Sequence, residues 1–242
     1  RSQAEWRYDS RTYRRRVLET VFERDPRIVH VDSLVLHPYL PLLVGRTVVL
    51  AHHWWTTDPT AGVAGPAIQR PSDTESWIER VERAWTPRVS VNLVSTEQER
   101  ARVLERAPDA RIETVPLAVD TRHFKPTAGT GHGLAYVGGT VGPASRDALE
   151  YFDTEILPKL RRASGVQALE PISWVGMARE GDRDRYRAHG IDIMGHVEDI
   201  RPVVRPAACF IVPRRLASGG TRILQAWAMG KAVVSTSVGC DG

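Results

Sequence analysis

The sequence predicts an α/β protein made of two blocks, in each of which short apolar strands alternate with amphipathic helices. Apolar residues make up 42% of the 242 residues, which is enough for real cores, and charges of both signs are mixed along the chain. Several apolar runs end in glycine. Alternating strands and helices form parallel sheets with right-handed crossovers, so each block is expected to be one layered domain.

The first block, residues 1–126, is expected to begin with a helix over residues 10–23 that stops before Pro26. Its predicted strands cover residues 27–35, 46–52, 89–94 and 111–116. Two capping-box patterns, Ser72-x-x-Glu75 and Ser95-x-x-Gln98, each predict a helix start. The first helix carries the cluster Arg14-Arg15-Arg16, interpreted as its solvated polar face, with contact to an acidic membrane surface as the alternative.

The glycine-rich stretch over residues 127–133 is interpreted as a linker to the second block, residues 134–242. Predicted strands there cover residues 134–137, 172–175, 192–194, 209–212 and 232–235. Helices are expected from about residue 144 and over 221–229, the latter ended by Gly230. Ligands bind at the carboxyl ends of such strands, which suggests two Rossmann-like domains facing a cleft.

The most informative segment is Ser218-Gly219-Gly220-Thr221, where a strand has ended and a helix begins. Free N–H groups at a helix start attract anions, and nearby arginines can grip a phosphate bidentately. Three arginines lie close in sequence: Arg214, Arg215 and Arg222. A plain helix cap with surface arginines is the competing interpretation of the segment.

The order of motifs in the chain resembles that of family-4 GT-B glycosyltransferases over most of residues 28–242. The donor-site motif is similar to residues 220–239 (GTRILQAWAMGKAVVSTSVG), and the base-binding turn to residues 195–202 (GHVEDIRP). The interdomain segment is similar to residues 115–126 (VPLAVDTRHFKP). The resemblance implies a GT-B fold of two Rossmann-like domains, each incomplete, with the acceptor side first and the nucleotide-sugar side second.

The resemblance also implies a retaining transferase that moves a sugar from a nucleotide sugar to a glycan or lipid-linked acceptor. No cofactor and no metal are expected, since the nucleotide sugar is a substrate. The candidate catalytic residues are His53 and Arg222, and Arg222 would stabilise the leaving diphosphate. The implied donor-binding residues are Gly138, Gly139, His196, Val197, Arg214, Arg215, Gly219, Gly220, Thr221, Gln225 and Asp241.

The chain departs from the family pattern just after Arg222, where two residues are missing and one of them is the phosphate-binding lysine. Gln225 replaces the ribose-binding glutamate and cannot offer two acceptor oxygens to a diol. Arg214 or Arg215 is the expected substitute for the lysine. A catalytically impaired sugar-nucleotide-binding protein of the same fold is therefore the alternative function, and an epimerase or phosphorylase is a weaker third.

Other functions are disfavoured by composition. The net charge of +4 is scattered, which argues against nucleic-acid binding, and no apolar run is long enough to span a membrane. Asp182-Arg-Asp184 resembles a metal motif but is interpreted as a charged helix start. We expect a cytoplasmic protein, with peripheral contact at the inner face of the membrane as an option, and a fragment that is marginally stable and inactive by itself.

Overall fold

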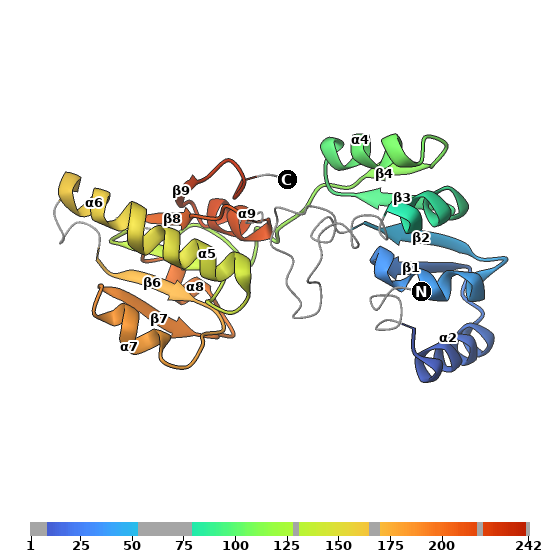
Figure 1. Ribbon diagram of the computed structural model, residues 1–242, viewed down its shortest axis with the longest axis horizontal. Helices are drawn as coiled ribbons and strands as arrows, with labels where there is room; N and C mark the ends of the chain where they lie inside the picture. The colour runs from blue at the N-terminus through green and yellow to red at the C-terminus, as the bar shows by residue number, and fades with distance from the viewer. Residues whose placement is uncertain (1–8, 53–78, 128–130, 165–169, 217–219, 241–242) are drawn as a thin grey trace. The chain divides into compact units, whose positions relative to one another are not determined.

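The computed structural model describes residues 9–52, 79–127, 131–164, 170–216 and 220–240. The chain forms two compact units, which meet in the sequence between Pro116 and Leu117. Each unit holds one parallel sheet with helices (Figure 1). The predicted α/β class with two sheets is confirmed.

The division lies ahead of the stretch expected to be a linker. Phe124 packs against the core of unit 2, and Pro126 lies close to Gly230 of the same unit. Gly131 and Gly133 are tightly enclosed as well, because a Cβ atom on either would meet backbone atoms within 2.3 Å. Phe124, Pro126, Gly131 and Gly133 thus contact unit 2.

Unit 1 contains a four-stranded sheet in the order β1-β2-β3-β4, with every neighbouring pair parallel. Its helical segments are α2, the 3₁₀ helices η1 and η3, a helical stretch over residues 79–85, and α4. The strands are β1 (Ile28–Asp32), β2 (Thr47–Ala51), β3 (Val91–Val94) and β4 (Ile112–Thr114). The helices with named bounds are α2 (Arg11–Arg24), η1 (Leu34–Leu43), η3 (Thr86–Arg88) and α4 (Glu97–Arg106).

Helix α2 is confirmed, and Ser10 caps it by accepting a hydrogen bond from the Tyr13 amide. The helix buries no residue, and the three clustered arginines pair with Asp9 and Glu19. These contacts are the expected behaviour of a solvated helix face. Within the described ranges, no helix is both long enough and apolar enough to cross a bilayer.

Two sequence expectations for unit 1 need correction. The capping box of α4 is Thr96-x-x-Glu99, one residue later than Ser95-x-x-Gln98, because the Thr96 hydroxyl accepts from the Glu99 amide while Glu99 bonds back. Glutamate supplies a charged acceptor there, which glutamine cannot. The strand expected over residues 27–35 ends at Asp32, and the 3₁₀ helix η1, which contains Pro38 and Pro41, follows from Leu34. Ser72-x-x-Glu75 lies outside the described residues.

Unit 2 contains a five-stranded parallel sheet in the order β7-β6-β5-β8-β9. The strands are β5 (Leu134–Val137), β6 (Ile172–Val175), β7 (Ile191–Gly195), β8 (Cys209–Val212) and β9 (Ala232–Ser235). The helices are α5 (Pro143–Tyr151), the π-helical η4 (Phe152–Ile156), α6 (Leu157–Ser164), α7 (Asp182–Arg187), α8 (Arg201–Val204) and α9 (Thr221–Ala228). The strands expected at 134–137, 172–175, 209–212 and 232–235 are all present.

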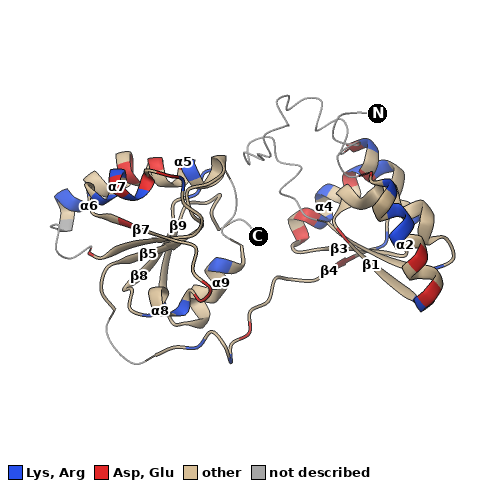
Figure 2. Cartoon of the chain, turned by 90° about the horizontal axis from the view of Figure 1, so that it is seen from below, with Lys and Arg blue, Asp and Glu red and all other residues tan. Residues whose placement is uncertain are grey.

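Helices cover both faces of this sheet. Figure 2 shows α5, α6 and α7 on one side and α8 and α9 on the other. Alternate residues of β5 and β6 enter two separate apolar clusters: Tyr136 and Trp174 belong to the first, and Val137 and Val175 to the second. Unit 2 is therefore a three-layer α/β/α sandwich, whose core explains why these inner strands are apolar on both faces.

The long helix after β5 departs from regular α geometry. Its middle, η4, is π-helical, which inserts an extra residue into one turn. Leu149 and Phe152 are buried as expected, but after the π turn the buried residue is Leu157, with Ile156 and Leu160 only partly buried. A prediction that assumes a constant period of about 3.6 residues cannot identify which residues face the core after the π turn.

Candidate functional site

The sheet of unit 2 has a topological switch point between β5 and β8. The connections from β5 to β6 and from β6 to β7 run through α5, α6 and α7, whereas those from β7 to β8 and from β8 to β9 run through α8 and α9. The two central strands therefore send their chains to opposite faces (Figure 2). Ligands bind outside the carboxyl ends of strands at such a point. The described residues there are 138–142 after β5, and 213–216 and 220–221 after β8.

Gly138 and Gly139 form the turn after β5, and packing demands them. A Cβ atom on Gly138 would come within 2.2 Å of the Tyr136 hydroxyl, and one on Gly139 within 2.5 Å of the Met177 carbonyl. Both glycine amides donate to the Val175 carbonyl at 2.8 Å. These two N–H groups are thus engaged within the protein, so a phosphate at this strand end would meet the amides that follow, at the start of α5.

Arg214 is anchored beside this glycine turn. Its Nε donates to the Tyr136 hydroxyl at 3.0 Å, and Thr236 donates to its backbone carbonyl. Tyr136 is almost fully buried, and burial raises the pKa of its phenol, an effect that the neighbouring Arg214 partly offsets. The contact brings the segment after β8 next to the segment after β5, two regions that the sequence predicted to share one site.

Arg215 faces a different partner. Its Nε and Nη2 bond the two carboxylate oxygens of Asp147 at 3.1 and 2.5 Å, and its guanidinium lies 4.3 Å from the centre of the Tyr151 ring. The bonds to Asp147 raise the pKa of the guanidinium. Arg215 is therefore bound to α5 as a bidentate ion pair, whereas Arg214 bonds the buried Tyr136 hydroxyl beside the glycine turn.

Helix α9 begins at Thr221 with Gly220 as its N-cap, which has a positive φ of 48° and provides no side-chain cap. Thr221 and Arg222 are exposed in its first turn. Arg222 donates to the Gln225 side-chain oxygen at 2.9 Å, so these two predicted residues contact each other. Gly219 lies outside the described residues.

The turn after β7 contains His196, which is exposed, and Val197, which packs partly against the second apolar cluster. Farther along, Arg201 holds Asp199 with three bonds of 2.8 to 2.9 Å. Hydrogen bonding from Arg201 lowers the pKa of Asp199 to about 2. Arg201 also donates to the His123 carbonyl, and so ties residues 117–127 to this turn.

Four further side chains hold the glycine turn, and the sequence interpretation missed them. Ser145 donates to the Gly138 carbonyl and the Trp174 indole to the Gly139 carbonyl, each at 2.8 Å. Thr140 donates to Asp182 at 2.6 Å, and both residues are buried. The sequence marked Asp182 only as part of a charged helix start, because nothing in the linear pattern shows that this acid points inward.

The first-block candidate His53 lies outside the described residues, as does Asp241. His52, which precedes His53 and directly follows β2, is 5% exposed. Its Nε2 lies 3.0 Å from the Asn92 side-chain oxygen. Asn92 uses its amide nitrogen on two carbonyls, so its oxygen accepts and His52 Nε2 carries the proton. The other ring nitrogen faces buried Glu82, whose carboxylate bonds Arg106 at 2.6 Å. His52 is a buried structural residue.

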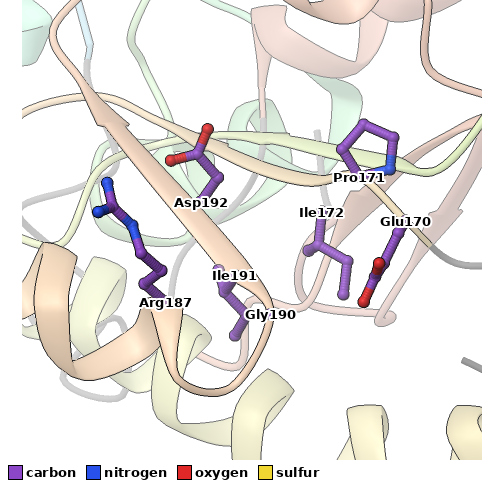
Figure 3. A pocket seen from close by; sticks show the side chains of 7 residues that line it. All are labelled: Glu170, Pro171, Ile172, Arg187, Gly190, Ile191 and Asp192. Carbon is purple, nitrogen blue, oxygen red and sulfur yellow. The ribbon is translucent and has the colours of Figure 1, made fainter.

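A pocket of about 440 Å³ lies at the opposite edge of the unit 2 sheet (Figure 3). It is lined by residues at the starts of β6 and β7, among them Pro171, Ile172 and Ile191. Figure 3 shows Arg187 and Asp192 on one side of it and Glu170 on the other. Because it adjoins the amino ends of the strands, it is separate from the glycine turns. Over the described part of the chain, no three His, Cys, Asp or Glu side chains gather as metal ligands would.

Comparison with known proteins shows a family similarity confined to the second part of the chain. Residues 131–242, a little less than half of the chain, match the family described as glycosyl transferases group 1. No curated protein matches the chain by sequence.

Solved structures share the fold at low sequence identity. Sucrose-phosphate synthase from Thermosynechococcus elongatus is 16% identical, with a TM-score of 0.66 over 94% of this chain and 60% of its own. HepE from Anabaena in complex with UDP is 13% identical, with a TM-score of 0.64 over 94% of this chain and 64% of its own. S. aureus TarM, solved with UDP, α-GlcNAc-glycerol and fondaparinux, is 12% identical, with a TM-score of 0.63 over 91% of this chain and 44% of its own.

The fold is thus that of the GT-B glycosyltransferases, in the two-unit α/β arrangement that the sequence predicted. The family match adds that residues 131–242, within the second unit, are similar to the glycosyl transferases of group 1. The chain spans less than two thirds of the length of the solved structures it matches.

Proposed function

We propose that the protein is a retaining glycosyltransferase that transfers a sugar from a nucleotide sugar to a glycan or lipid-linked acceptor at the cytoplasmic side of the membrane. The observation that carries this proposal is the switch point of unit 2, where the glycine turn after β5 meets Arg214 from the segment after β8. Nucleotide phosphates favour such a place, because helix starts and fixed arginines converge there.

The proposed roles rest on the resemblance to the family motifs and, for the described residues, on their position in unit 2. Arg214, Arg222 and the amides of residues 219–221 would bind the diphosphate and stabilise its charge as the bond to the sugar breaks. The acceptor oxygen would form the new bond on the same face of the sugar, and its proton would leave with the diphosphate. His196 and Val197 would contact the base, and Asp241 and His53 are proposed to contact the sugar. No metal or cofactor has a role in this scheme.

A second candidate function is a sugar-nucleotide-binding protein with impaired catalysis. The contact between Arg222 and the Gln225 oxygen favours it, because that oxygen is engaged within α9. A ribose diol would need to displace this contact before Gln225 could bind it.

Turnover separates the two candidates. The chain is incubated with UDP-, GDP- and ADP-linked sugars, and the release of nucleoside diphosphate is measured beside binding of UDP, GDP and ADP by calorimetry. Binding with release supports the transferase, and binding without release supports the alternative. If no nucleotide binds, both candidates are refuted.

Two arginines provide a sharper test of the diphosphate site. Replacing Arg214 by Ala should weaken binding of the preferred nucleoside diphosphate about tenfold, the value of one charge-assisted contact. Replacing Arg215 by Ala should weaken it less than about threefold, because Arg215 is paired with Asp147. The exposed Arg162 on α6 provides the matched control, R162A, which should bind like the wild type. Equal losses for R214A and R215A would contradict this assignment.

A further inference from the structure

We propose that the start of α7 is a positioning element for the donor site: Asp182 holds the turn after β5 through Thr140, while the adjacent Arg183 holds the turn after β7. The inference rests on the proposed function, because it assigns a purpose to two loops of the nucleotide site. It gives the Asp182-Arg-Asp184 motif a role other than metal binding.

The Thr140 side chain is the centre of the first contact. Thr140 has no exposed surface, and its hydroxyl donates to Asp182 Oδ2 at 2.6 Å while accepting from the Arg179 amide at 3.0 Å. Its own amide donates to the Met177 carbonyl at 2.8 Å. The hydroxyl and the amide of Thr140 thus bond to residues between the end of β6 and the first residue of α7. The turn after β5 is thereby attached to the start of α7.

The Asp182 carboxylate is 6% exposed, and a second group shares the oxygen that Thr140 binds. Arg146, in the first half of α5, lies 3.5 Å from Asp182 Oδ2. A buried carboxylate is costly unless it is hydrogen-bonded and paired, and this one is both. Its bonds reach the two residues that flank the start of α5, so the carboxylate sets the position of the α5 amides relative to β5.

The second contact runs from the neighbouring residue. Arg183 Nη2 donates to the Met194 carbonyl at 3.0 Å, at the end of β7. A Cβ atom on Gly195 would lie 2.4 Å from the same nitrogen, so the glycine lets the guanidinium approach. His196, the predicted base contact, comes directly afterwards. Two consecutive residues of α7 therefore hold the turn after β5 and the end of β7, next to the proposed base contact.

Holding both turns in place before the ligand arrives would reduce the ordering that binding must impose. Groups locked by packing and by outer hydrogen bonds bind more tightly, because less conformational entropy is lost. Asp182 touches neither ligand nor reacting atoms in this scheme. It is a positioning residue that acts through Thr140.

The test is a double-mutant cycle read by calorimetry with UDP, GDP and ADP on the whole chain. T140V and D182A should each weaken the preferred nucleotide about tenfold, and T140V/D182A should lose little more than either, because both remove one contact. T140S, which restores the hydroxyl, should recover most of the affinity that T140V loses. D184N is the matched control, because Asp184 is an exposed acid of the same motif and should bind like the wild type.

Melting temperatures are measured on every variant, so that loss of affinity is separated from loss of fold. If T140V or D182A fails to fold, D182N and T140S carry the test: D182N should weaken binding about threefold, and T140S should bind more tightly than D182N. The inference would be overturned, and the proposed function left standing, if the losses of affinity in the cycle were additive. Wild-type affinity in both D182A and D182N would have the same consequence. Failure of the wild-type chain to bind any of the three nucleotides would instead refute the proposed function and the inference with it.

Discussion

Both units bury polar side chains near the carboxyl edge of a parallel sheet, yet they use them for different purposes. In unit 1, buried His52 hydrogen-bonds Asn92 and faces buried Glu82, which pairs with Arg106, and so these residues connect strands and helices of the framework. In unit 2, Thr140 and Asp182 bond each other to hold a turn after a strand. Burial by itself does not mark a functional residue; the kind of element that a buried polar group connects is more informative.

The comparison predicts opposite consequences for mutations in the two networks. In unit 1, removing a buried charge should affect folding and leave nucleotide binding to unit 2 unchanged. In unit 2, removing a contact to a turn should affect binding more than folding.

The largest effect is expected at Glu82, which is 1% exposed. E82A leaves Arg106 without its buried carboxylate partner, and breaking such a pair costs about 3 kcal/mol of unfolding free energy. Denaturant unfolding of unit 1 measures the loss, and calorimetry checks that nucleotide affinity is retained. The matched control is E105Q, at an exposed position of α4, which should stay within about 0.5 kcal/mol of wild type. If E82A also lowered nucleotide affinity, and by as much free energy as it lowers stability, the proposed difference between the two units would be wrong.

A smaller effect separates two glycines in the turn region of unit 2. Gly139 and Gly142 both have positive φ, at 70° and 93°, so alanine strains the backbone at both. Only at position 139 does a Cβ also meet backbone, 2.5 Å from the Met177 carbonyl, whereas nothing lies within 4 Å at position 142. G139A should therefore lower nucleotide affinity at least about tenfold more than G142A, since the turn must move. Comparable affinities by calorimetry would show that the turn does not position the ligand.

The smallest effect is expected at the exposed pair Asp199–Arg201. Arg201 lowers the pKa of Asp199 to about 2 from an ordinary value of 3.8. A lowered carboxylate pKa stabilises the fold at pH above the ordinary value, and this contribution disappears as the pH falls toward 2. R201Q should return the Asp199 pKa toward 3.8, as followed by NMR titration, with little change in melting temperature at neutral pH, because exposed pairs contribute little. A pKa that stays near 2 in R201Q would assign the shift to another cause.

The linear pattern was sufficient to predict most elements of unit 2. Strands such as β5 and β8 are buried on both faces and end at glycine or proline, so their apolar runs define their bounds. The end of helix α9 could also be predicted, because Gly230 adopts the left-handed conformation that ends it. The pattern was insufficient for η1, for the π turn in η4 and for the register of the α4 cap. In each of these, competing local geometries differ by small energies that neighbouring packing decides.

The candidate site divides in the same way. Glycines and arginines at strand ends and helix starts could be identified from residue type alone, because those types suit anion binding. Their assignment as ligand contacts stays a prediction for Arg222, His196, Val197 and the others. The sequence could not separate Arg214 from Arg215, which are adjacent and identical in type but bond Tyr136 and Asp147 respectively.

By itself, the sequence determined the α/β class, the second unit's strand order along the chain and the family motifs, because periodicity and residue type record local preferences directly. Only the tertiary structure decided which groups meet across the chain. Thr140 and Asp182 are 42 residues apart and become partners only when α7 packs beside the turn after β5. The amides of Gly138 and Gly139 are engaged by Val175 through the same packing. Such pairings depend on the whole sandwich, since a hydrogen bond between distant residues forms only where the fold places both.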